Sequence, residues 1–124
     1  MDHTYAQATD PLNMDTIASL RELQGDDDPE FLKDLIATFF EETDEQLVGL
    51  EQAVAQQNAI GFQKIAHALK SSSANVGAVQ VSKLCRELEE MGRNGQVEGA
   101  AQKLEAIKYE YQRAQTALQE ACAN

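Results

Sequence analysis

The chain has 124 residues, of which 43% are hydrophobic, and its 21 acidic and 10 basic residues give a formal net charge of -11. This length and hydrophobicity are typical of one folded domain with a single core. The negative charge opposes binding to nucleic acids and to anionic membranes, which excludes broad electrostatic binding to either. The sequence contains no apolar run of about 18 residues and no secretion leader, so we expect a cytoplasmic protein. We also expect it to be a monomer.

The first part of the chain predicts a tail and two helices. Residues 1–12 have no apolar periodicity and are interpreted as a flexible tail. A short helix is expected from Asn13 or Asp15, two possible N-caps, with Ile17, Leu20 and Leu23 facing inward. A long helix should begin at Pro29, after the capping residue Asp28, and extend to about residue 57. Its apolar side chains form one stripe, which consists of Leu32, Leu35, Ile36, Phe39, Phe40, Leu47, Leu50 and Val54.

Three more amphipathic helices follow. The first has Asn58 as its cap and ends before Gly77, the second spans about 78–91, and the third spans about 96–121. Short loops between amphipathic helices are typical of antiparallel neighbours. We therefore predict an all-α fold in which residues 13–121 form one antiparallel up-and-down four-helix bundle with a short additional N-terminal helix. The predicted inward residues of these three helices are Phe62, Ile65, Ala66, Leu69, Ser73 and Val76; Val81, Leu84, Cys85, Leu88 and Met91; and Val97, Ala101, Leu104, Ile107, Tyr111, Ala114 and Leu118.

His67 is the residue whose position indicates chemistry. At about 100° per residue, the apolar side chains of its helix fall within roughly 60° of one direction, whereas His67 falls near 140° and points to solvent. Lys64 and Lys70 flank it one turn away on either side. Residues 59–86 contain four basic residues and no Asp or Glu, in a chain that is otherwise strongly acidic. This local positive charge favours an anionic ligand.

Several kinds of chemistry can be weighed for this histidine. A neutral imidazole is a good nucleophile near neutral pH and can attack a phosphoryl group. A catalytic triad is unsupported because no acid lies on this helix, and a metal-binding bundle lacks ligands because position 64 is Lys rather than Glu. The two cysteines, Cys85 and Cys122, are far apart and predict neither a disulfide framework nor a zinc site. The glycines match no nucleotide-binding motif. We therefore expect no bound metal, cofactor or nucleotide.

The sequence around His67 resembles the histidine-phosphotransfer (HPt) domain of bacterial-type multistep phosphorelays. The usual motif of that family is His-x-Leu-Lys-Gly-Ser, followed by Gly-Ala a few residues later. The run HALKSSSANVGA matches this pattern at His67, Leu69, Lys70, Ser72, Gly77 and Ala78. Two further segments, GDDDPEFLKDLIATFFEE and LCRELEEMGRNG, are similar to the helices before and after the motif, so the resemblance spans roughly residues 12–95.

The resemblance implies a function and a role for particular residues. His67 would accept a phosphoryl group from a receiver-domain aspartate, or from a kinase, and pass it to another receiver aspartate. Lys70 would hold or neutralise the phosphoryl group, and Ser71 would replace the usual glycine, where its hydroxymethyl group either narrows access or hydrogen-bonds the phosphate. The face that docks the partner would include Gln63, Lys64, Ala74 and Arg86.

The same resemblance implies partners and leaves one alternative open. The partners would be a response-regulator receiver domain and a sensor or hybrid histidine kinase, with Mg²⁺ in the receiver, and the protein would be a stoichiometric phosphocarrier rather than an enzyme. The next helix brings positions 86–89 level with His67, so Arg86 and Glu89 are candidates for a hydrogen bond near the imidazole, although an acid beside a phosphate is expected to be unfavourable. The alternative is a non-catalytic helical adaptor that binds a receiver or kinase through the same face without being phosphorylated.

Overall fold

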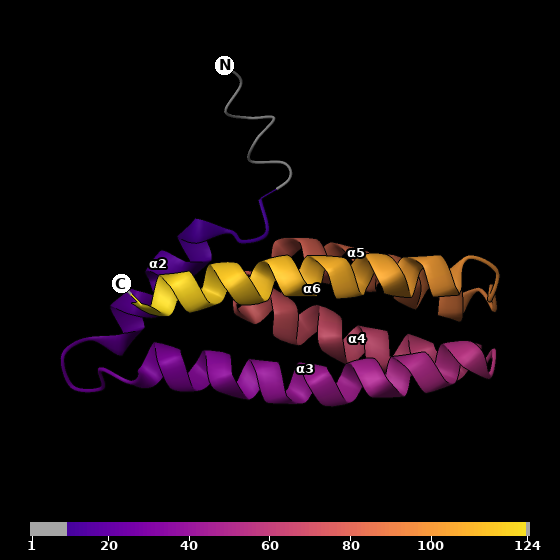
Figure 1. Ribbon diagram of the computed structural model, residues 1–124, viewed down its shortest axis with the longest axis horizontal. Coiled ribbons are helices and arrows are strands. Elements are labelled where there is room, and N and C mark those ends of the chain that lie inside the picture. Colours follow the sequence, from indigo (N-terminus) through magenta and orange to yellow (C-terminus); the bar gives the residue numbers. More distant parts are fainter. Residues whose placement is uncertain (1–9, 124) are drawn as a thin grey trace, which may run out of the picture.

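The computed structural model describes residues 10–123, which contain five α-helices and no strand. The helices are α2 (Met14–Gln24), α3 (Phe31–Ala55), α4 (Ala59–Asn75), α5 (Val79–Arg93) and α6 (Ala100–Ala123). Figure 1 shows α3, α4, α5 and α6 along the long axis of the molecule, with α2 at the end where the C-terminus lies. Each long helix contacts the next one, and α6 returns to contact α3, which closes the bundle. The predicted all-α four-helix bundle with a short N-terminal helix is confirmed.

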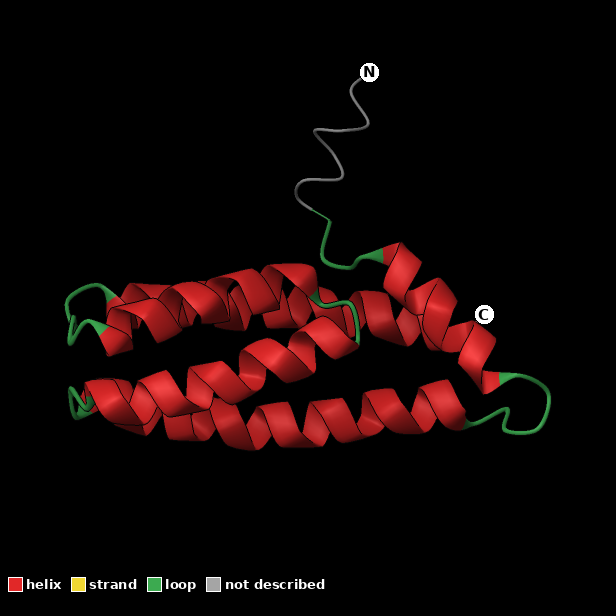
Figure 2. Ribbon diagram, turned by 180° about the vertical axis from the view of Figure 1, so that it is seen from behind, coloured by secondary structure: helices red, strands yellow, loops and turns green. Residues whose placement is uncertain are grey.

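The helix starts follow local capping at two positions and long-range contacts at a third. Asn13 caps α2 by accepting a hydrogen bond from the Asp15 amide, and Asn58 caps α4 in the same way through the Gly61 amide. The predicted start of α3 at Pro29 with Asp28 as its cap is wrong, because the helix begins at Phe31. Its first turn is capped from elsewhere in the chain: Gln24 at the end of α2 accepts a hydrogen bond from the Leu32 amide at 2.9 Å. Figure 2 shows the loop that joins these two helices.

The start of α6 is also later than the sequence predicts. Gly95 and Gly99 both adopt positive φ angles, of 70° and 85°, so the chain turns twice before the helix begins at Ala100. The later start changes the inward residue of the first turn. Ala100 is buried, whereas Ala101, which was predicted to face inward, is exposed.

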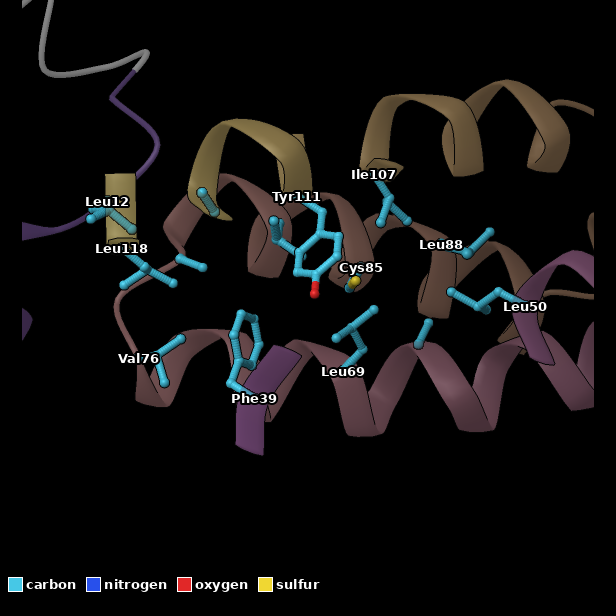
Figure 3. Packing of buried hydrophobic residues seen from close by; sticks show 14 of the residues in the cluster. Leu12, Phe39, Leu50, Leu69, Val76, Cys85, Leu88, Ile107, Tyr111 and Leu118 are labelled. Carbon is cyan, nitrogen blue, oxygen red and sulfur yellow. The ribbon is translucent and has the colours of Figure 1, made fainter. Parts of the chain in front are cut away.

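The apolar stripes of the four long helices meet in one core. Figure 3 shows Phe39 of α3, Leu69 of α4, Cys85 of α5 and Tyr111 of α6 converging there. The predicted inward residues of these helices are buried or partly buried, apart from Ala101. The fully buried side chains of greatest volume are Phe62, Ile17, Leu50, Leu69, Leu88, Ile107 and Leu118. Burial of apolar surface on this scale is the main source of stability in a bundle of this size.

Two expectations for the N-terminal segment need correction. Leu23 was predicted to face inward but is 73% exposed, because it lies about 120° around the helix from the buried Ile17. Leu12 was assigned to the tail but is buried in the core cluster, so the folded domain includes it. Residues 1–9 of the predicted flexible tail lie outside the described residues. No helix among those described combines the length and the apolar composition needed to cross a membrane.

The close contact between α4 and α5 positions the site. Gly92 of α5 lies directly against the first turns of α4, where an added Cβ would be only 2.7 Å from the Ala59 carbonyl oxygen and from Gln63 Cβ. Because the two helices are antiparallel, one turn back along α5 from Gly92 corresponds to one turn forward along α4 from Gln63. This register places Glu89 opposite His67.

Candidate functional site

His67 lies in the middle of α4, and its side chain is 63% exposed. The outward direction calculated from the helical angle is therefore confirmed. The neighbouring residues Phe62, Ala66 and Leu69 are completely buried and fix the rotation of the helix about its axis. Packing of one face of α4 thus determines where the imidazole on the other face points.

A buried carboxylate on the next helix holds the imidazole. The Nδ1 atom of His67 is 2.7 Å from Oε2 of Glu89, whose side chain is only 5% exposed. A carboxylate can only accept hydrogen bonds, so this contact assigns the ring proton to Nδ1. The remaining nitrogen, Nε2, then carries the free lone pair, and it makes no hydrogen bond within residues 10–123. The site therefore holds the ring by Nδ1 and turns Nε2 away from Glu89, on a side chain that is 63% exposed.

Two cations contact Glu89. Lys70 Nζ donates to Oε1 at 2.7 Å, and the Arg93 guanidinium donates to Oε2 at 3.0 Å. The hydrogen bond from Lys70 is the largest cause that lowers the pKa of Glu89 below its usual value, and the bond from His67 lowers it further, while burial acts in the opposite direction. Of the two candidates for a hydrogen bond near the imidazole, Glu89 makes it, on the Nδ1 side of the ring, and two cations contact the same carboxylate.

The other predicted site residues lie around this cluster. The Ser71 hydroxyl is exposed and donates to the His67 carbonyl oxygen at 3.4 Å, so it is directed to the backbone. Lys64, Ala74 and Arg86 are exposed and Gln63 is half-buried where it packs against Gly92. Arg86 was a candidate for a bond near the imidazole, but neither it nor Lys64 makes an ion pair in the described part of the chain.

A basic groove adjoins the histidine. It encloses about 260 Å³ between the start of α2, the end of α4 and the start of α5. Its lining contains three cations, Lys70, Lys83 and Arg86, and no acidic residue. Three of the four basic residues of the acid-free segment 59–86 thus line one groove, although the protein as a whole is strongly acidic.

Comparison with known proteins shows the family to which the chain belongs. The family model of the Hpt domain matches residues 34–117, which contain both His67 and Glu89. The chain belongs to the Hpt domain family. It is 29% identical over 109 residues to histidine-containing phosphotransfer protein 2 of Arabidopsis thaliana, a match that covers 86% of this chain and 70% of that protein.

Solved structures of Hpt proteins share the fold. Histidine-containing phosphotransfer protein B (HptB) of Pseudomonas aeruginosa PAO1 has a TM-score of 0.84 and 29% identity, with 93% of this chain and 96% of that chain covered. MtHPt2 of Medicago truncatula has a TM-score of 0.82 and 28% identity, with 97% of this chain and 83% of that chain covered.

A protein called pseudo histidine-containing phosphotransfer protein 2, from Oryza sativa subsp. japonica, is also similar in sequence. It is 27% identical over 94 residues, which cover 74% of this chain and 62% of that protein.

Sequence reasoning singled out His67 but missed part of the cluster that holds its side chain. Arg93 was not singled out, although its position four residues after Glu89 is a recognisable helical ion-pair spacing. Among the described residues, no group of three or more His, Cys, Asp or Glu side chains is placed to hold a metal ion. Cys85 is buried, and burial raises the pKa of its thiol to about 12, so it is not a reactive nucleophile.

Proposed function

We propose that this protein is an intermediate of a multistep phosphorelay that carries a phosphoryl group on Nε2 of His67. Membership of the Hpt domain family supports the relay function. The observation that carries the assignment to His67 is the 2.7 Å contact between Nδ1 and the buried Glu89, which leaves an exposed Nε2 lone pair. One relative is named a pseudo histidine-containing phosphotransfer protein, so similarity to this family does not by itself identify a phosphate-accepting histidine. The proposal therefore depends on the geometry of His67.

In the proposed reaction, the Nε2 lone pair attacks the phosphorus atom of an aspartyl phosphate on a receiver domain. The bond between phosphorus and the aspartate oxygen breaks, and its electron pair returns to the aspartate carboxylate. The ring keeps its Nδ1 proton and gains a positive charge, which the Glu89 carboxylate stabilises at 2.7 Å. Transfer to a second receiver aspartate reverses these steps with a new acceptor oxygen.

The surrounding residues of the proposed site assist without forming a complete active site. Lys70 lies one turn after His67 and supplies a flexible cation for the phosphoryl oxygens. The receiver supplies Mg²⁺, which compensates the phosphate charge in its own acidic pocket. No nucleotide site is proposed for this chain, so it acts as a stoichiometric carrier rather than an enzyme.

The proposed docking surface surrounds His67 and consists of Gln63, Lys64, Ala74 and Arg86. The adjoining groove with Lys83 extends its positive charge. An acidic receiver pocket complements this surface and accelerates encounter at low salt. The protein is proposed to act as a cytoplasmic monomer with receiver domains and a sensor or hybrid histidine kinase as its partners.

The test is phosphorylation by receiver domains from the same organism. Each phosphorylated receiver is mixed with the protein, and acid-labile, base-stable phosphate is measured and mapped by mass spectrometry. We expect the label on His67, complete loss in His67→Gln and no loss in the matched variant His3→Gln. His67→Gln should keep its helical content and melting temperature, because the side chain is largely exposed. A non-catalytic adaptor would instead bind a receiver without acquiring any label.

A further inference from the structure

The two oxygens of Glu89 are held by different donors. Among the described residues, Oε1 accepts a hydrogen bond from Lys70 alone, whereas Oε2 accepts from both His67 Nδ1 and Arg93. Lys70 comes from α4, on the same helix as His67, and Arg93 comes from the last turn of α5. One carboxylate therefore has two positive partners, although a single cation is enough to balance its charge.

Phosphorylation of His67 would add a second negative group that competes with Glu89 for these cations. A phosphoryl group brings a charge of about -1.5 to -2 near neutral pH, placed here on the exposed side of the ring. Lys70 lies one turn from His67, its side chain is 29% exposed, and its long flexible stem can redirect the ammonium group. Arg93 instead donates to the same oxygen that holds Nδ1, on the side of the ring away from Nε2.

We propose that Lys70 changes partner from Glu89 to the phosphoryl group when His67 is phosphorylated, and that Arg93 is the positioning residue that then keeps Glu89 charged against Nδ1. This inference rests on the proposed function. Before phosphorylation either cation balances the carboxylate. After it, Arg93 is the one of the two cations that still balances the carboxylate while the ring charge develops.

The need for Arg93 follows from burial. A carboxylate that is 5% exposed and has no cation partner favours its neutral, protonated form. A neutral Glu89 would no longer offset the positive charge that the ring gains as the bond from Nε2 to phosphorus forms. Arg93 should therefore have little influence on the resting site and a clear influence on the formation of phosphohistidine.

The experiment uses phosphoramidate, a small phosphoryl donor, so that no partner protein is required. Nε2 of His67 attacks the phosphorus atom of the zwitterionic donor, whose nitrogen already carries three protons. The phosphorus–nitrogen bond breaks, and the nitrogen leaves with the electron pair as ammonia. Four proteins are compared: the wild type, Arg93→Gln, Lys70→Gln and the double variant. Arg113→Gln is the matched control, because Arg113 also pairs with a glutamate one turn earlier on its own helix, at 2.8 Å, but on α6. The ring nitrogens are followed by ¹⁵N NMR and phosphohistidine by ³¹P NMR.

Before phosphorylation, Arg93→Gln should show the same Nδ1-protonated ring as the wild type and Arg113→Gln. In the Lys70→Gln background, Arg93→Gln should change the ¹⁵N signals of the His67 ring, because neither Lys70 nor Arg93 then contacts Glu89. With phosphoramidate, Arg93→Gln should be phosphorylated roughly ten-fold more slowly than Arg113→Gln, the effect of weakening one hydrogen bond to a charged group.

Two results would overturn the exchange of partners. Phosphorylation of Arg93→Gln at the rate of Arg113→Gln would show that Arg93 has no positioning role. A disturbed ring in unphosphorylated Arg93→Gln, with Lys70 present, would show that Arg93 is required at all times rather than after Lys70 moves. Failure of the proposed function is a separate outcome, because the wild type itself would then acquire no phosphohistidine.

Discussion

Glu89 on α5 and Thr43 on α3 are both buried polar side chains of the same bundle, but their surroundings differ. Glu89 is charged and accepts hydrogen bonds from three side chains. Thr43 is completely buried, and its hydroxyl has no hydrogen-bond partner among the described residues, nor does Oε1 of Gln46 one turn later. A buried polar atom without a partner costs stability, whereas a fully bonded one can fix a geometry. Glu89 is thus a buried polar group whose hydrogen bonds orient the imidazole, whereas the hydroxyl of Thr43 is a buried polar group that makes no hydrogen bond to the described residues.

The largest expected effect belongs to the apolar core that surrounds both positions. Leu69 is completely buried on the face of α4 opposite His67, so Leu69→Ala should lower the free energy of unfolding by about 2–5 kcal/mol. Chemical denaturation followed by circular dichroism measures this loss. The exposed substitution Ala68→Ser on the same helix is the control and should change stability by less than about 0.5 kcal/mol. A similarly small value for Leu69→Ala would mean that the helix phase is wrong.

Removing the charge of Glu89 should affect function more than folding. Glu89→Gln keeps the shape and an acceptor oxygen but cannot stabilise a positive ring, so phosphorylation of His67 should slow about 10- to 100-fold. The rate is measured with phosphoramidate, which removes partner docking from the comparison. Glu87→Gln is a matched control on α5, because Glu87 pairs with Lys103 rather than with the site. Equal rates in the two variants would contradict the role of Glu89.

The predictable part of this site follows from single helices, and the rest depends on how helices meet. The direction of His67 could be calculated because it needs only the apolar stripe of α4. Glu89 could be named only as one of two candidates with Arg86, because the choice depends on the register of α5 against α4, which the close approach at Gly92 sets. The start of α3 was misplaced for a similar reason, since its cap is Gln24 of α2 rather than a local residue.

The contribution of the charged Glu89 side chain to stability should be lost at acidic pH. Its pKa is lowered in the folded protein, chiefly by the bond from Lys70, so its contribution to stability is complete above the unfolded carboxyl pKa of about 4.3 and is lost as the pH falls through the folded value. His67→Gln and His67→Gln/Glu89→Gln are compared, because this background removes the imidazole from the titration. Their difference in unfolding free energy should shrink below about pH 4.3. A difference that stays constant down to pH 3 would mean that Glu89 is not stabilised in its charged form.

The smallest expected effect on stability concerns Thr43, the buried polar residue without a hydrogen-bond partner among the described residues. Thr43→Val replaces the buried hydroxyl with a methyl group of similar size, which removes a polar atom that has no partner in the described residues. Stability should stay constant or rise by up to about 1 kcal/mol. Ser73→Ala is the matched control, since Ser73 is equally buried but donates to the Leu69 carbonyl oxygen at 2.7 Å.

The two variants should therefore differ in sign. Loss of the bonded Ser73 hydroxyl should lower the free energy of unfolding by about 1 kcal/mol, the usual net contribution of one buried hydrogen bond. Both values come from the same urea titrations, and phosphorylation of His67 should be unchanged in Thr43→Val because α3 contributes no residue to the site. A loss of about 1 kcal/mol or more in Thr43→Val would place a hydrogen-bond partner on its hydroxyl. Thr43 and Glu89 would then both be buried polar side chains with hydrogen bonds, and they would differ only in that Glu89 is charged.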